Sequence, residues 1–169
     1  YMRCAGEILD QLHKQKKSVS AIVVASGSAA THVGLLLGLR LLRSKIPVHG
    51  ICVRRDKKQQ VSRVKDIVRL AENLIGCGEV VQEDDIKCHD EWLQPGYGRT
   101  NEFVYEAMTL AGNLEAMVVD PVYTAKSFAG AVGLYRQGLF NKSQNILYLH
   151  TGGTPAIFAY ARQITEMLN

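Results

Sequence analysis

The amino-acid sequence predicts an α/β fold, a doubly wound and mostly parallel sheet with helices on both faces. Short apolar runs rich in β-branched residues alternate with segments in which apolar residues recur at helical spacing. Two of these runs end in turns of small residues, at 26–31 and 151–154, and lead directly into helical patterns. The 169 residues are 47% hydrophobic and 21% charged, a composition typical of globular domains. We therefore expect a single α/β domain over residues 1–169.

The first elements are a helix over 2–16, a strand over 21–25 and a helix over 31–42. Apolar residues of the first segment, such as Ala5 and Ile8, share one helical face. The second segment is uniformly apolar, which predicts a buried strand. The third is apolar nearly all round, which indicates a helix packed in the interior.

The middle of the chain predicts a strand over 47–53 and a long amphipathic helix over 61–75. The helix has apolar residues at intervals of three and four, and Gly76 or Gly78 closes it. Residues 79–99 give no clear element beyond a turn rich in proline and glycine.

The last part of the chain predicts further helices and another strand. They are a helix over 100–111, a short strand or extended segment over 116–119, a helix over 125–137 and a strand over 146–149. A final helix follows, with Thr154 as its N-cap and Pro155 as its first residue, because both residue types are favoured at those positions.

The turn after the first strand has the properties of an anion-binding site. It consists of Ser26, Gly27, Ser28, Ala29, Ala30 and Thr31. Small side chains let the backbone approach a ligand, and a helix N-terminus offers unpaired N–H groups and a partial positive charge. The turn and its counterpart at 151–154 lie at the carboxyl edge of the sheet, where ligands bind. Similar turns occur in α/β proteins without a ligand, so the turn alone only favours a phosphate site.

Charge and composition argue against several classes of partner. The formal net charge is +4, and basic residues occur in scattered pairs, so we expect no nucleic-acid partner. The longest apolar stretch, 33–39, is too short to span a bilayer, so we expect no membrane partner. Four widely spaced cysteines favour free thiols in a reducing compartment, which points to the cytoplasm. The acidic cluster 83–85 has no spaced histidines and predicts a solvated loop rather than a metal site.

Four segments together resemble one known family. They are 24–34 (VASGSAATHVG), 96–98 (GYG), 120–127 (DPVYTAKS) and 147–156 (LYLHTGGTPA). In this order and spacing the chain resembles the D-cysteine desulfhydrase and 1-aminocyclopropane-1-carboxylate (ACC) deaminase family. These are pyridoxal-phosphate enzymes of the tryptophan-synthase-β-type fold. The resemblance extends over nearly the whole chain.

The resemblance implies a pyridoxal 5'-phosphate cofactor and a small amino-acid substrate. It implies that the 26–31 turn holds the cofactor phosphate and that Thr124 lies beside the pyridine nitrogen. It also implies that Tyr97 and Tyr123 are catalytic residues that face the substrate. The turn at 150–154, with Thr151 and Gly152, would line the substrate pocket.

The chain departs from the family pattern in two ways. Ala29, Ala30 and Ala125 stand where the family usually has glycine, and alanine adopts positive φ less readily. The family's Schiff-base lysine lies in an N-terminal region without a counterpart here, and Lys126 does not match it. We therefore expect the chain to be the larger, C-terminal, cofactor-cradling part of a longer enzyme, inactive without its N-terminal remainder. The family also implies a homodimer.

Thr124 favours one reaction within the family. A neutral hydroxyl leaves the pyridine nitrogen unprotonated, which makes a weaker electron sink suited to β-elimination of a good leaving group. In the family pattern glutamate marks deaminases and threonine marks desulfhydrases. We therefore expect β-elimination of D-cysteine, or a related β-substituted amino acid, to pyruvate, ammonia and hydrogen sulfide. The alternatives are ACC deamination and a non-catalytic domain that binds phosphate or a partner.

Each candidate residue also has an ordinary structural explanation. Tyr97 could be a surface residue of a flexible loop, and Tyr123 could be a packed aromatic residue with a satisfied hydroxyl. Thr124 could simply cap a helix. His32 and His150 fit a helix start and a strand end better than they fit catalytic bases.

Overall fold

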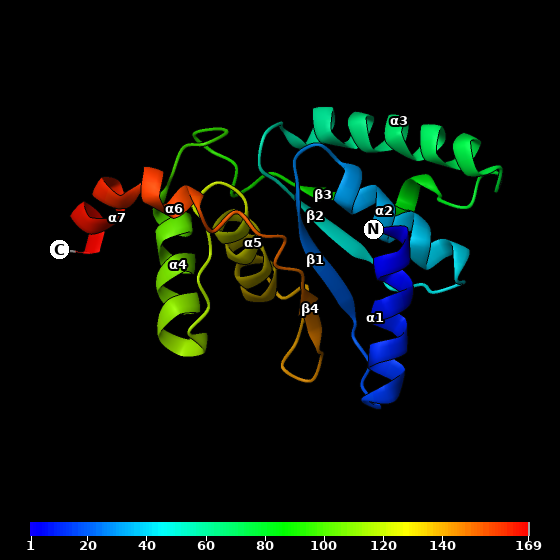
Figure 1. Cartoon of the computed structure of the whole chain (residues 1–169), viewed down its shortest axis with the longest axis horizontal. Helices are drawn as coiled ribbons and strands as arrows, with labels where there is room; N and C mark the ends of the chain where they lie inside the picture. Colours follow the sequence, from blue (N-terminus) through cyan, green and yellow to red (C-terminus); the bar gives the residue numbers. More distant parts are fainter. Residues whose placement is uncertain (169) are drawn as a thin grey trace.

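The computed structural model describes residues 1–168, which form one parallel sheet flanked by helices (Figure 1). The strand order is β3-β2-β1-β4. The strands are β1 (Ala21–Ser26), β2 (Val48–Cys52), β3 (Lys87–His89) and β4 (Ile146–Tyr148). The helices are α1 (Met2–Lys14), α2 (Ala30–Leu41), α3 (Lys57–Ile75), α4 (Glu102–Glu115), α5 (Thr124–Arg136), α6 (Ala156–Ala159) and α7 (Ala161–Leu168), with a 3-10 turn at Glu83–Asp85.

Helices cover both faces of the sheet because successive side chains of a strand point to opposite sides. Ile22 and Val24 of β1 pack with α1 and α2, whereas Ala21 and Val23 pack with α4 and α5. Figure 1 shows the same division, with α1, α2 and α3 on one side of the sheet and α4 and α5 on the other. The predicted doubly wound α/β fold is confirmed, and every strand pair is parallel.

The elements around the first two strands agree closely with the sequence pattern. Most residues of α2 are buried, as its apolar character predicted. Helix α3 begins at Lys57, ahead of its apolar pattern, because the Asp56 side chain accepts a hydrogen bond from the Gln59 N–H at 2.8 Å and caps the helix. Gly76 ends α3 in the left-handed conformation, with φ +67°.

Two segments in the middle of the chain differ from the prediction. Strand β3 lies within 79–99, where the sequence indicated no element, and pairs with β2 with Lys87 opposite His49. Three residues are too few to show the alternation that marks a strand. Residues 116–119 form no strand, because α4 continues to Glu115 and Ala116 ends it in the left-handed conformation.

The prediction for the final helix was wrong in its start, and two helices, α6 and α7, stand where one was expected. Pro155, not Thr154, is the N-cap, and α6 is a single turn. Tyr160 interrupts the helix, and its hydroxyl donates to the carbonyl oxygen of Gly98 at 2.5 Å. Helix α7 follows α6 and lies at the left end of the view in Figure 1, next to the C-terminus. Over residues 1–168, no helix has both the length and the apolar character needed to cross a bilayer.

Candidate active site

A pocket of about 260 Å³ at the carboxyl edge of the sheet brings together segments that are far apart in the sequence. Its lining residues are Tyr1, Thr31, Tyr123, Thr151, Gly152 and Gly153. The pocket forms there because β1 and β4 are parallel neighbours, so the segments that follow them leave the sheet at the same edge. Four of the predicted site residues therefore share one pocket.

The turn between β1 and α2 has a row of free backbone N–H groups. Over the described part of the chain, the N–H groups of Gly27, Ser28 and Ala29 donate to no protein acceptor, and that of Ala30 makes only a long bond of 3.4 Å to Ser28 Oγ. These groups lie at the N-terminus of the 12-residue α2, which adds a partial positive charge. The turn therefore fits a phosphate group.

Ala29 adopts a backbone conformation that is uncommon for alanine. It is the N-cap of α2 with φ 76°, and its methyl group is buried in the cluster that includes Val33 and Val64. The left-handed conformation costs an alanine about 1–2 kcal/mol. The turn thus forms with alanine at this position, at the expense of local strain.

This strain predicts opposite responses from two neighbouring alanines. Ala29→Gly should keep the free energy of unfolding or raise it by up to about 1 kcal/mol, because relief of strain exceeds the loss of one buried methyl group. Ala30→Gly is the matched control, since Ala30 is exposed and is the first residue of α2, and glycine there should cost up to about 1 kcal/mol. Urea denaturation measures both variants, and equal losses would show that Ala29 carries no strain.

The turn rests on a buried polar network. Gln60 Nε2 donates to Ser26 Oγ at 2.9 Å, and His32 Nδ1 lies 3.1 Å from the same oxygen. The carbonyl oxygen of Gly27 accepts from Arg55 Nη1 at 2.8 Å and from Gln60 Nε2 at 3.3 Å. The Ser26 hydroxyl is therefore engaged inside the protein, and the network fixes the backbone from which the turn begins. His32 is fully buried within it and serves the structure of the turn.

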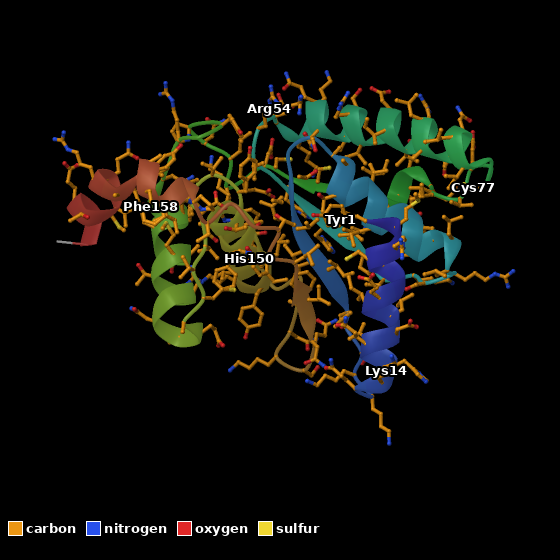
Figure 2. The ribbon with its side chains drawn as sticks, in the orientation of Figure 1. Tyr1, Lys14, Arg54, Cys77, His150 and Phe158 are labelled. Carbon is orange, nitrogen blue, oxygen red and sulfur yellow. The ribbon has the colours of Figure 1, made fainter. Side chains whose placement is uncertain are left out.

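Tyr97 and Tyr123 form a pair beside the pocket, although 26 residues separate them. Their hydroxyls share a short hydrogen bond, and their ring centroids lie 5.9 Å apart. The guanidinium of Arg54, which lies at the upper edge of the molecule in Figure 2, sits 5.7 Å from the Tyr97 ring centroid. The bond to Tyr97, together with burial, raises the pKa of Tyr123 to about 12. Tyr123 is thus a neutral hydroxyl at physiological pH, able to donate or accept a hydrogen bond.

Asp120 organises the start of α5. Its carboxylate accepts hydrogen bonds from the backbone N–H groups of Val122, Tyr123 and Thr124 at 2.8–2.9 Å. The Thr124 hydroxyl donates to Asp120 Oδ1 at 2.7 Å and accepts from the Asp120 N–H at 2.6 Å. Both residues are fully buried, so the Thr124 hydroxyl is part of the structure of this helix start. The explanation of Thr124 as the helix N-cap was wrong, because Tyr123 is the N-cap of α5 and the Thr124 hydroxyl bonds only to Asp120, whose carboxylate accepts the N–H groups at the helix start.

Asp120 also connects α5 to the turn after β4. A Cβ atom added to Gly153 would lie 2.5 Å from Asp120 Oδ1, so the two segments are in close contact. Gly153 has φ +100°, which favours glycine for a second reason. In the same region, His150 Nε2 is hydrogen-bonded to the carbonyl oxygen of Val118 at 2.9 Å, which makes His150 a structural residue at the strand end.

Several residues of this site had no assigned role at the level of sequence. Asp120 carries a recognisable signal, because an Asp-Pro pair favours the start of a turn. Arg54 and Gln60 carry none, since their contacts join them to residues more than 25 positions away. Within residues 1–168, no group of three or more His, Cys, Asp or Glu side chains could hold a metal ion, and all four cysteines are free.

The comparisons with known proteins agree with this geometry. A family model described as "Pyridoxal-phosphate dependent enzyme" matches residues 1–152, most of the chain. The chain belongs to this family. The predicted resemblance and the family's cofactor, pyridoxal phosphate, are thereby confirmed.

Three known proteins show which members of the family this chain is similar to. The chain is 39% identical over 160 residues to a D-cysteine desulfhydrase of Salmonella typhi, covering 95% of this chain and 48% of the relative. It is 37% identical over 164 residues to a D-cysteine desulfhydrase of Serratia proteamaculans, covering 97% and 49%. A crystal structure of an ACC deaminase homologue superposes with a TM-score of 0.85 at 32% identity, covering 99% of this chain and 49% of that one. The chain thus spans about half the length of the curated relatives it matches.

Proposed function

We propose that the protein carrying this chain converts D-cysteine, or a related β-substituted amino acid, and water to pyruvate, ammonia and hydrogen sulfide. The observation that carries the proposal is the pocket lined by Thr31 at the end of the 26–31 turn, by Tyr123, which is bonded to Tyr97, and by the Thr151–Gly153 turn. The similarity to D-cysteine desulfhydrases and the neutral Thr124 support this reaction over others of the family.

Each part of the site has a role in this proposal. The free N–H groups of the 26–31 turn bind the phosphate of pyridoxal phosphate, and Thr151 and Gly152 line the substrate side of the pocket. The bound cofactor supplies an electron sink for the carbanion formed when the amino acid loses its α-proton. Tyr97 and Tyr123 are about half and one-third exposed, so their hydroxyls can reach and orient the substrate.

We further propose that this chain is the cofactor-cradling part of the enzyme and that an N-terminal remainder supplies the lysine that attaches the cofactor. Lys126 is unsuited to that task because its Nζ donates to the carbonyl oxygens of Leu93 and Gly96 and the residue does not line the pocket. The resemblance also supports a cytoplasmic homodimer, and light scattering of the purified protein tests the oligomeric state.

The test of the function is a product assay on the protein with any flanking segments that its gene encodes. Pyruvate and sulfide should appear in equal amounts from D-cysteine in the presence of pyridoxal phosphate, with little product from L-cysteine. 2-Oxobutanoate from ACC, without sulfide from D-cysteine, would instead establish the deaminase. Bound cofactor with no product from any of these amino acids would leave the binding domain as the function.

ACC deamination is the second candidate, because the structural neighbour with a TM-score of 0.85 is named an ACC deaminase homologue. Thr124 distinguishes the two candidates, since the family's deaminases usually carry glutamate at this position.

Three substitutions at residue 124 separate its electronic role from its structural one. Thr124→Ser keeps the hydroxyl and should retain the elimination rate. Thr124→Val keeps the side chain neutral and should lower stability, because the Asp120 N–H loses its acceptor, but it should change the rate little. Thr124→Glu should slow elimination about tenfold, which corresponds to ~1.4 kcal/mol of barrier. Steady-state pyruvate release measures all three, and equally slow Val and Glu variants would assign Thr124 a purely structural role.

A further inference from the structure

Lys126 is the largest fully buried side chain of the described residues. It lies in the first turn of α5, and its Nζ donates to the carbonyl oxygens of Leu93 and Gly96 at 3.0 and 2.6 Å. No carboxylate of the described chain forms an ion pair with it. Burial lowers the pKa of this ammonium to about 8. A neutral amine keeps two N–H donors, so both protonation states can serve the two carbonyls.

A buried amine without a counter-ion is costly, and an apolar side chain at this position would fill the space without that cost. The two acceptors indicate what the lysine provides. Leu93 and Gly96 precede Tyr97, which is bonded to Tyr123, and Tyr123 lies three residues before Lys126 on the adjoining end of α5. The lysine thus connects the two segments that carry the paired tyrosines.

We propose that Lys126 is a positioning residue that ties the 93–98 segment to the start of α5 and so holds the Tyr97 hydroxyl against that of Tyr123. The consequence for substrate orientation rests on the proposed function. The tie, meaning the two hydrogen bonds by which Lys126 joins the 93–98 segment to α5, does not.

Other tethers hold this segment, so the role of Lys126 needs a specific test. The Asn101 side-chain amide donates to the Gln94 carbonyl oxygen, and the Tyr160 hydroxyl donates to that of Gly98. Neither contact fixes Gly96, the residue directly before Tyr97. Gly96 and Gly98 flank Tyr97, and of the three tethering side chains only Lys126 belongs to α5, the helix whose N-cap is Tyr123.

The test compares Lys126→Met with the parent protein, including any flanking segments. Methionine keeps an unbranched apolar stem and removes both hydrogen bonds. Amide hydrogen exchange in 93–98 should accelerate at least about tenfold, since the loss of even one of the two charge-assisted hydrogen bonds accounts for that factor, while β1 and α2 stay protected. The NMR signal of Tyr97 Cζ, measured with isotope-labelled tyrosine, should move as it does in Tyr123→Phe, which breaks the same pair. Lys58→Met, at an exposed site, is the control and should change neither signal.

Unchanged exchange in 93–98, or an unchanged Tyr97 Cζ signal in a folded Lys126→Met protein, would overturn the proposal. If the variant does not fold, the parent protein still decides the question. In the parent protein, the Lys126 amine should become accessible to an amine reagent only when the 93–98 segment opens. Its labelling rate should therefore equal the opening rate measured by amide exchange in 93–98. Fast labelling while the segment stays protected would also overturn the tie.

Activity provides a separate readout. If Lys126 acts through Tyr97, kcat/KM of the double variant Lys126→Met/Tyr97→Phe should be no lower than that of Tyr97→Phe alone. If the double variant instead loses kcat/KM by the product of the two single-variant factors, Lys126 acts independently of Tyr97. A protein without activity would refute the proposed function, while hydrogen exchange and the Tyr97 signal would still decide the tie.

Discussion

Asp120→Ala should lower the free energy of unfolding by about 3 kcal/mol, because it removes the acceptor of three backbone N–H groups and one hydroxyl in a fully buried place. Hydrogen bonds to a charged group each contribute about 1.5–3 kcal/mol, and some of the freed donors will find water. Urea denaturation measures the loss. Asp66→Ala, at an exposed position of α3, is the matched control and should change stability by less than about 0.5 kcal/mol.

Asp120→Asn refines the same prediction. The amide keeps the shape and one acceptor oxygen, but its NH₂ group faces donors, so we expect an intermediate loss. If Asp120→Ala were no more destabilising than Asp66→Ala, Asp120 would not organise the start of α5. The position of Tyr123 in the pocket would then need another cause.

The parts of the fold that the sequence predicts are those formed by local patterns. Strand β1, the turn after it and helix α2 are consecutive, and their burial follows from an apolar run and a nearly apolar helix. The 26–31 turn could be located for the same reason, since small residues between a strand and a helix are a local signal. The left-handed conformation of Ala29 could not, because residue identity argued against it.

The parts that the sequence does not predict depend on long-range contacts. Strand β3 exists because β2 offers an open edge, and three residues contain too little pattern to reveal it. The single-turn α6 ends where Tyr160 bonds to Gly98, a contact across 62 residues. The family resemblance named Tyr97 and Tyr123 individually, but only the fold shows that they are bonded to each other.

Gly50→Ala should disturb the 26–31 turn through the side chains that support it. Gly50 lies in the buried centre of β2, where an added Cβ would be 2.3 Å from His32 Nδ1 and 3.0 Å from Ser26 Cβ. The imidazole must move, which breaks its bond to Ser26 and disturbs the backbone that precedes the turn. Overpacking and the loss of a buried hydrogen bond each cost about 1–3 kcal/mol, so we expect a total loss of about 3–4 kcal/mol. Gly112→Ala, where a Cβ meets nothing within 4 Å, is the control and should be neutral or stabilising.

A second substitution shows whether the imidazole is the cause. In the Gly50→Ala protein, His32→Ala makes room for the new methyl group and should restore part of the stability, although His32→Ala alone is destabilising because it empties a buried site. Binding of inorganic phosphate, followed by NMR of the Ser28 and Ala29 amides, should weaken in Gly50→Ala and remain intact in Gly112→Ala. If the double variant is less stable than Gly50→Ala by the full cost of His32→Ala, the two residues do not interfere. The glycine in β2 would then serve the sheet rather than the turn.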